Sequence, residues 1–154
     1  MAVENGADEV DIVLNVGRML TGEYDEAANE VEVIRTEMDE DVVLKVIIES
    51  GALKTPELIR KASLLSMLAG ADFVKTSTGK INVAATPEAA VVMCQAIKDY
   101  FEKTGRKVGF KAAGGVRTPE DAALYYTIVE EILGKEWLTT DLLSAIEGKE
   151  IKYY

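Results

Sequence analysis

The sequence contains no histidine and only one cysteine among its 154 residues. Without histidine, the chain cannot build a Ser-His-Asp or Cys-His catalytic arrangement, and it lacks the usual nitrogen ligand of zinc. A single cysteine cannot form a disulfide within the chain, so we expect a reducing, cytoplasmic environment in which Cys94 packs as an inert core residue. Any catalysis must therefore depend on carboxylates, lysines, hydroxyls and backbone dipoles.

Long apolar stretches and an excess of positive charge are also missing. No segment approaches the roughly 18 uninterrupted apolar residues of a transmembrane helix, so no membrane association is predicted. The N-terminal residues MAVENGADEVD lack the basic and apolar regions of a secretory signal. The net charge of -10 argues against a nucleic-acid partner, because phosphate backbones select basic surfaces. With 48% apolar residues, the chain can form one domain over residues 1–154 with a substantial core.

Short apolar segments rich in β-branched residues alternate with helical patterns along the chain. The predicted strands cover residues 9–16, 41–50, 71–79 and 107–115. The predicted helices cover residues 23–38, 55–70, 86–105 and 118–134, and a short amphipathic helix is expected around 139–147. Three of the helices begin with Thr-Pro-Glu, an N-cap followed by proline in the first turn. This order predicts an α/β fold with parallel strands, either an open doubly wound sheet or an arc of a (β/α)8 barrel.

Every predicted strand carries an ionisable residue where a buried strand should be apolar. These residues are Asp11, Lys45, Lys75 and Lys111. Because side chains alternate across a strand, the four can converge inside a barrel, near the carboxyl ends of the strands where barrel enzymes place their chemistry. In a doubly wound sheet they would lie under helices at a large desolvation cost. Any one of them could reach water from a strand end, but four in consecutive strands favour a partial barrel with a site.

Lysines close to one another and to a carboxylate point to imine chemistry. An amine nucleophile must lose its proton, and burial and a neighbouring cation both lower the pKa of a lysine from about 10.4. Such an amine forms a Schiff base with a carbonyl substrate, and a carboxylate can transfer protons beside it. Aldol cleavage, decarboxylation and transaldolase-type transfer are all compatible with this set of residues.

Two segments that follow the third and fourth predicted strands have the composition of anion-binding loops. Their candidate residues are Thr78, Gly79 and Lys80 in the first segment, and Gly114, Gly115 and Arg117 in the second. Glycine allows backbone N–H groups to approach an anion closely, and the cationic side chains add positive charge. Taken alone, GGVR is equally typical of an ordinary turn. A nucleoside-triphosphate loop of the GxxxxGK type is not predicted, because Val74 replaces its first glycine.

The strings GADEVDIV, LLSMLAGADFVKTSTGK and VGFKAAGGVRTPEDA closely resemble the deoxyribose-phosphate aldolase family, and the resemblance extends from about residue 5 to about residue 138. It implies a class I aldolase on a (β/α)8 barrel that needs no metal or other cofactor. Its substrate would be a small sugar phosphate, 2-deoxy-D-ribose 5-phosphate, cleaved reversibly to glyceraldehyde 3-phosphate and acetaldehyde.

The resemblance also implies roles for the candidate residues. Lys75 resembles the imine-forming lysine, Lys111 the second lysine that perturbs the first, and Asp11 the carboxylate of the proton relay. Lys45 occupies a strand lysine position of the same network. The candidate anion-binding residues of both loops fall where the family holds the substrate phosphate.

The sequence departs from the family pattern mainly in its extent. It matches barrel strands 4–7, about four parallel strands with flanking helices, and lacks counterparts of the first three βα units and of the eighth strand. Residues 1–138 are aldolase-like, and residues 139–154 are expected to form a C-terminal helix and tail. Ala112 stands where the family commonly has proline. Exposed sheet edges would favour a homo-oligomer.

Three functions remain open at this point. The first is an aldolase, impaired by the missing part of the barrel. The second is a non-catalytic fragment that binds a sugar phosphate or associates with itself. The third is a different Schiff-base lyase.

Overall fold

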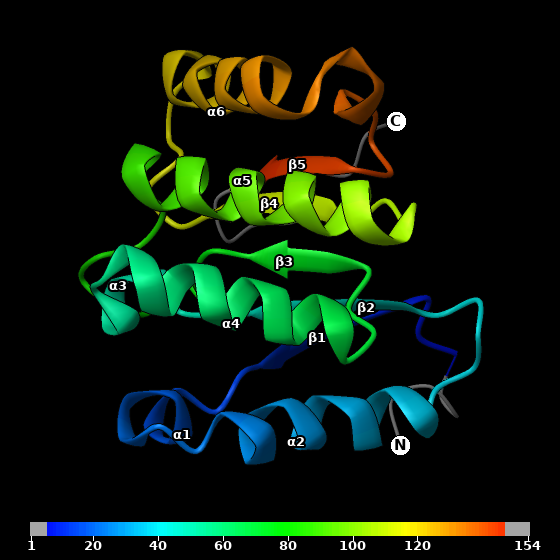
Figure 1. The fold of residues 1–154 in the computed structure, drawn as a ribbon. Helices are drawn as coiled ribbons and strands as arrows, with labels where there is room; N and C mark the ends of the chain where they lie inside the picture. Colours follow the sequence, from blue (N-terminus) through cyan, green and yellow to red (C-terminus); the bar gives the residue numbers. More distant parts are fainter. Residues whose placement is uncertain (1–5, 147–154) are drawn as a thin grey trace.

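The computed structural model describes residues 6–146, which form one parallel sheet with helices packed along one of its faces (Figure 1). The strands are β1 (Glu9–Val13), β2 (Val43–Ile47), β3 (Phe73–Lys75), β4 (Gly109–Ala113) and β5 (Leu143–Ile146). They lie in sequence order, and all neighbours are parallel. A doubly wound sheet reverses its strand order at a switch point, so the sequential order confirms the predicted arc of a (β/α)8 barrel.

The described helices are α1 (Val16–Thr21), α2 (Tyr24–Thr36), α3 (Ser50–Leu53), α4 (Pro56–Leu68), α5 (Pro87–Thr104), α6 (Pro119–Leu133) and the short 3-10 helix η2 (Lys135–Trp137). Three of them, α4, α5 and α6, begin where the Thr-Pro-Glu pattern places them. The hydroxyls of Thr55, Thr86 and Thr118 each accept a backbone N–H in the first turn of α4, α5 and α6. The four helices predicted over 23–38, 55–70, 86–105 and 118–134 are confirmed, whereas α1, α3 and η2 are additional short helices that close the turns between strands and longer helices.

The chain after η2 differs from the sequence-based prediction. The amphipathic helix expected around 139–147 is wrong for its described part, because Leu143–Ile146 forms β5 and pairs in parallel with β4. The expectation that no strand follows the fourth is corrected by the same finding. Since the edge of β4 offers unpaired backbone groups, a short apolar segment is better satisfied there as a strand than as an isolated helical turn. Residues 147–154 of the expected tail lie outside the described residues.

The core lies between the sheet and its helices. On the central strands, the residues that face the helices are fully buried, among them Val46 on β2, Val74 on β3 and Phe110 on β4. Cys94 on α5 belongs to the same core at 0% exposure, and burial raises the pKa of its thiol to about 12. This confirms the expected core position of Cys94 and keeps the thiol protonated and unreactive at neutral pH.

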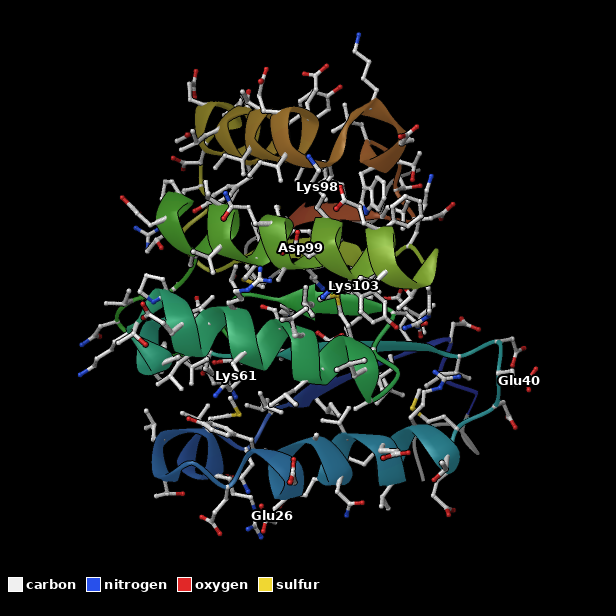
Figure 2. All side chains as sticks on the ribbon, viewed as in Figure 1. Glu26, Glu40, Lys61, Lys98, Asp99 and Lys103 are labelled. Carbon is white, nitrogen blue, oxygen red and sulfur yellow. The ribbon has the colours of Figure 1, made fainter. Side chains whose placement is uncertain are left out.

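The outer surface of the helices is charged. Figure 2 shows Lys61 of α4 and Lys98, Asp99 and Lys103 of α5 on the side of the helices away from the sheet. Asp99 joins the two helices through an ion pair with Arg60 (2.7 Å). Among residues 6–146, no helix is both long enough and apolar enough to cross a membrane.

Trp137 fixes the chain between α6 and β5. Its side chain is 2% exposed, and its indole N–H donates a hydrogen bond to the carbonyl of Val108 (2.9 Å). Its ring packs edge-to-face on Phe101 of α5, with the ring centroids 5.1 Å apart. Because these contacts join η2 to α5 and to the start of β4, they set the position from which the chain enters β5.

Gly109 provides the space for an aromatic ring on the face of the sheet opposite the helices. It lies beside Phe73 in the register of β3 and β4. A Cβ atom at Gly109 would lie 2.4 Å from the Phe73 ring, too close without displacement. The same ring supports Lys45, whose Nζ lies 5.0 Å from the ring centroid. The absent side chain of Gly109 thus determines where one of the predicted site lysines is held.

We expect Gly109→Ala to lower the free energy of unfolding by about 1–3 kcal/mol, because the new methyl group overpacks the Phe73 ring. Urea unfolding followed by circular dichroism measures the loss. Gly17→Ala in α1 is the matched control, because its Cβ would meet only Asn15 Oδ1, at an ordinary 3.4 Å. Combining Gly109→Ala with Phe73→Leu should recover part of the loss. Equal stability of Gly109→Ala and wild type would contradict this account of the packing.

Candidate functional site

The four ionisable strand residues lie on the same face of the sheet, opposite the helices. In the parallel register, Asp11 of β1 is aligned with Lys45 of β2. One layer further toward the carboxyl ends, Lys75 of β3 is aligned with Lys111 of β4. The predicted convergence of these residues on one face is therefore found in the structure, and it follows from side-chain alternation in strands of matched register.

Asp11 lies within reach of both Lys75 and Lys111. Its Oδ2 atom lies 2.6 Å from Nζ of Lys75 and 3.9 Å from Nζ of Lys111. The lysine side chains are 13% and 17% exposed, whereas the carboxylate is 34% exposed. We call Asp11, Lys75 and Lys111 the lysine–aspartate cluster. It has the composition that imine chemistry requires: two amines in a mainly buried position with a carboxylate within reach of both.

Burial lowers the pKa of Lys111 below its usual value of 10.5. Desolvation is the largest cause, and the positive charges of Lys75 and Lys45 lower the pKa further. The carboxylates of Asp11 and Glu9 act in the opposite direction, because they stabilise the ammonium form. Lys111 therefore loses its proton more readily than a lysine in water.

Lys45 lies one layer below the lysine–aspartate cluster. Its Nζ atom is 2.5 Å from the Glu9 carboxylate, and its side chain covers the ring of Phe73. At 6% exposure, it is one of the few buried charged residues of the described chain. The structure therefore places Lys45 on the predicted face but pairs it with Glu9, so that it acts on the cluster through its charge.

The two predicted anion-binding loops lie next to each other beyond the ends of β3 and β4. Gly79 and Gly114 are in close approach, since a Cβ on Gly114 would lie 3.1 Å from Cα of Gly79. Gly114 and Gly115 both have positive φ values, 80° and 83°, which glycine adopts without strain. The carbonyl of Gly114 accepts the N–H of Ala85 (3.1 Å), so the first loop folds over the second.

Several backbone donors of the two loops are occupied by side-chain oxygens. The N–H of Gly79 donates to Ser77 Oγ (2.9 Å), and that of Lys80 donates to Thr78 Oγ1 (3.3 Å). In the second loop, the N–H of Arg117 donates to the Asp121 carboxylate (2.9 Å). The loops are therefore preformed, and an anion that uses these backbone donors has to exchange with the present acceptors.

Glu49 is a site residue that the sequence analysis missed. It lies two residues after the end of β2, is 8% exposed and has a left-handed backbone (φ 49°, ψ 59°). Its carboxylate accepts hydrogen bonds from the N–H and the hydroxyl of Thr78, at 2.7 and 2.9 Å. The only signal in the sequence was an acidic residue immediately after the apolar run of 41–48.

Thr76 links the ends of β3 and β4 behind the loops. Its buried hydroxyl donates to the carbonyl of Ala113 (3.0 Å) and accepts the N–H of the same residue (2.9 Å). The carbonyl of Thr76 in turn accepts the N–H of Ser50 (2.8 Å). The ends of three neighbouring strands are therefore connected just below the two loops.

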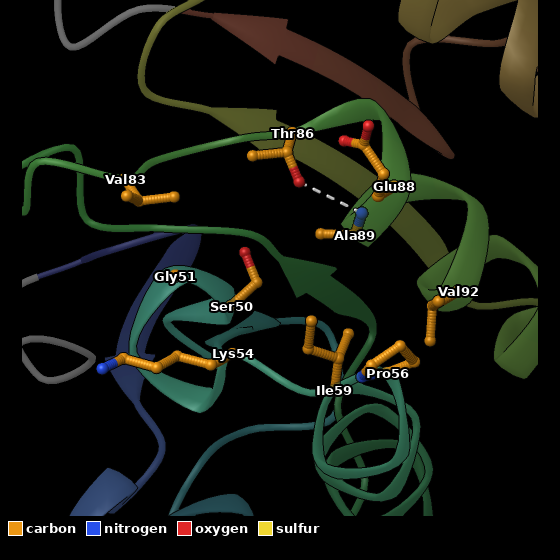
Figure 3. A pocket seen from close by; sticks show the side chains of 10 residues that line it. All are labelled: Ser50, Gly51, Lys54, Pro56, Ile59, Val83, Thr86, Glu88, Ala89 and Val92. Carbon is orange, nitrogen blue, oxygen red and sulfur yellow. Dashed lines mark hydrogen bonds between the residues drawn. The ribbon is translucent and has the colours of Figure 1, made fainter.

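A pocket of about 440 Å³ opens between α3, α4 and the start of α5 (Figure 3). Ser50, Ile59, Val83 and Thr86 are among the residues that line it, and none of the predicted site residues does. The Ser50 hydroxyl is buried and lacks a hydrogen-bond partner among the described residues. This pocket is separate from the lysine–aspartate cluster.

The sequential parallel sheet has helices on one face and the lysine–aspartate cluster on the other, and it defines a partial α/β barrel. A family model described as "DeoC/LacD family aldolase" matches residues 1–134. The chain belongs to this family. It is 49% identical over 142 residues to a deoxyribose-phosphate aldolase of Mus musculus, and 46% identical over 136 residues to one of Agrobacterium fabrum.

Solved structures agree with the fold. A structure described as "QR15, an Aldolase" superimposes with a TM-score of 0.74 at 31% identity, over 94% of this chain and 57% of that one. A deoxyribose phosphate aldolase from Aeropyrum pernix, described as tetrameric, has a TM-score of 0.69 at 27% identity, over 92% of this chain and 52% of that one. The match to the mouse protein covers 92% of this chain but 44% of that protein, and the Agrobacterium match covers 88% and 51%. The chain thus spans about half the length of the curated relatives that it matches.

We expect Asp11→Asn to lower the pKa of Lys111 further, because it removes the carboxylate that favours the ammonium form. An NMR titration of the lysine side-chain resonances measures the change, with Asp25→Asn on the exposed face of α2 as a control. In the wild type, folded Lys111 binds fewer protons than the unfolded chain between its lowered pKa and about 10.5. Its contribution to stability should therefore rise with pH through that interval. An unchanged or higher Lys111 pKa in Asp11→Asn would refute the assigned coupling.

Proposed function

We propose that the chain is a Schiff-base aldolase acting on 2-deoxy-D-ribose 5-phosphate, with Lys75 as the nucleophile. The observation that carries the proposal is the 2.6 Å contact between Nζ of Lys75 and the Asp11 carboxylate, with Lys111 beside it. Membership of the DeoC/LacD aldolase family supports this chemistry. The products would be glyceraldehyde 3-phosphate and acetaldehyde, and no metal or other cofactor is required by this route.

The proposed reaction assigns one step to each member of the cluster. The neutral amine of Lys75 adds to the substrate aldehyde to form a carbinolamine, which takes up a proton at its hydroxyl group and loses water to give a protonated imine. The Asp11 carboxylate or neutral Lys111 then removes the proton of the hydroxyl group on the carbon β to the imine. The bond between the α and β carbons breaks, and its electrons pass into the imine to give an enamine. Glyceraldehyde 3-phosphate leaves, the enamine carbon takes up a proton, and water releases acetaldehyde from Lys75. The lowered pKa of Lys111 makes its neutral amine more accessible than that of an ordinary lysine, which suits it to accept and return protons.

The adjacent loops supply the proposed phosphate site. Lys80 and Arg117 are exposed cationic residues on the first and second loop, and Gly79, Gly114 and Gly115 allow close approach of an anion. Thr78 is the remaining predicted member of this site. The position of the loops beyond the strand ends is the usual place of phosphate sites in barrels.

We also propose that the chain associates with itself and acts in the cytosol. β1 forms one edge of the sheet, and Val13 at its end is 52% exposed on the face that carries the cluster. Unpaired strand edges readily pair with another chain. The tetrameric Aeropyrum pernix relative is compatible with an assembled state. The single buried cysteine suits a reducing compartment.

We expect acetaldehyde followed by sodium borohydride to label Lys75 covalently, because reduction traps the imine as a secondary amine. Intact mass measurement should show the addition of one ethyl group, and peptide mapping should place it on Lys75. Lys75→Met should abolish the label. Lys98→Met, on the exposed surface of α5, is the matched control and should be labelled normally.

Two outcomes of the trapping experiment would point elsewhere. Labelling of another lysine in the wild type would reject Lys75 as the nucleophile. An unlabelled protein that still gains thermal stability with 2-deoxyribose 5-phosphate would instead favour the non-catalytic binding function.

Sedimentation equilibrium at micromolar concentration should show a species larger than the monomer, because the sheet edge and the face beside it are open. We expect Val13→Lys to shift the protein toward the monomer by placing a charge there. Leu124→Lys is the matched control, since Leu124 is a similarly exposed apolar residue (45%) on α6, away from this edge. A monodisperse wild-type monomer would rule out the proposed association.

A further inference from the structure

Glu49 occupies a backbone conformation that its residue type disfavours. Its φ value of 49° lies in the left-handed region, where a Cβ atom meets steric resistance. It is nevertheless buried, and its two carboxylate oxygens both accept hydrogen bonds from Thr78. An unfavourable conformation persists where the surroundings determine it, and such residues concentrate at functional sites.

These hydrogen bonds use both donors of Thr78. Threonine has one backbone N–H and one hydroxyl proton, and each is directed to a different oxygen of Glu49, at 2.7 and 2.9 Å. The hydroxyl oxygen also accepts the N–H of Lys80 (3.3 Å). Thr78 therefore has no donor left to offer an anion unless the contact with Glu49 breaks.

We propose that Glu49 is a positioning residue that holds the loop of Thr78, Gly79 and Lys80 in its anion-binding form, and that Thr78 acts through Glu49 and is not itself a phosphate ligand. This inference rests on the proposed function, because the anion is taken to be the phosphate of the substrate. The two oxygens of the Glu49 carboxylate accept the backbone and hydroxyl donors of Thr78 at the start of the loop. Charge-assisted hydrogen bonds of this kind are stronger than neutral ones and fix geometry.

The arrangement also connects the anion loop to the lysine–aspartate cluster. Glu49 lies two residues after Ile47, which is aligned with Lys75 in the register of β2 and β3. Thr78 lies three residues after Lys75 on the next strand. The Glu49–Thr78 contact therefore joins the chain beyond β2 to the chain beyond β3, so the distance between nucleophile and anion loop depends on this contact.

Inorganic phosphate is the probe that tests the inference without requiring turnover. Its affinity for the wild type, Glu49→Gln, Thr78→Val and the double variant is measured by NMR titration of the loop amides. Glu49→Gln removes the negative charge from both hydrogen bonds and leaves one acceptor oxygen in place of two, so we expect phosphate binding to weaken about 10- to 100-fold. Thr78→Val, which keeps the N–H, should weaken binding less. The double variant should bind no more weakly than Glu49→Gln, because both changes break one contact.

Further measurements separate positioning from folding. Glu57→Gln in the exposed first turn of α4 makes the same chemical change and should bind phosphate like the wild type. Circular dichroism melting identifies a Glu49 variant that does not fold, in which case Thr78→Val carries the test. For the active enzyme, Glu49→Gln should raise KM for 2-deoxyribose 5-phosphate more than KM for 2-deoxyribose, and should change kcat less than KM.

The inference is overturned by wild-type-like phosphate affinity of Glu49→Gln, or by additive losses in the double variant, which would make Thr78 a direct ligand. Absence of phosphate binding by the wild type would overturn it as well. The acetaldehyde trapping experiment fails or succeeds separately, because it does not involve phosphate. A coupled Glu49–Thr78 pair in a protein without Lys75 labelling would leave this inference standing and reject the aldolase proposal.

Discussion

The rest of the site depends on the contacts of the Asp11 carboxylate with Lys75 and Lys111. Matched register places Lys75 and Lys111 side by side on neighbouring strands, which lie about 4.8 Å apart. Two ammonium groups at this spacing, both mainly buried, repel each other and lose hydration. Asp11 offsets both costs because its Oδ2 atom contacts Lys75 at 2.6 Å and remains within 3.9 Å of Lys111. Removing this anion would leave the paired cations with weaker compensation, such as that of Glu9 for Lys111.

Side-chain alternation explains why the cluster could be predicted from the sequence. A charged residue inside an apolar strand points to one of the two faces of the sheet. Because the helices cover one face with apolar contacts, the charged residues are expected together on the opposite face. The alternation signal holds whenever strands pair in parallel with matched register, as they do here. A second local signal located three helix starts, because the threonine of the Thr-Pro pattern at Thr55, Thr86 and Thr118 caps the helix that follows.

What the sequence could not predict depends on contacts between distant segments. β5 was expected as a helix because LLSAI fits either period, and only the open edge of β4 decides between them. Glu49 was missed because its role requires Thr78 to fold back from the next strand. The loop donors were expected to be available to an anion, but side chains such as Ser77 occupy them in the folded chain. Such features depend on tertiary contacts and leave little local pattern.

The burial of the site residues is uneven across the sheet: side chains on β1 are more exposed than those on β3 and β4. Lys111 on β4 is buried enough for desolvation to lower its pKa. On β1, however, Asp11 remains 34% exposed and Val13 52% exposed. Lys75 stands between these two environments. Covering the β1 side would remove water from Asp11 and strengthen its attraction for Lys111, which favours the protonated form of that lysine. Further desolvation of Lys111 itself acts in the opposite direction. A surface that packs against β1 therefore favours the neutral amine of Lys111 only if its desolvation of Lys111 outweighs the stronger attraction by Asp11.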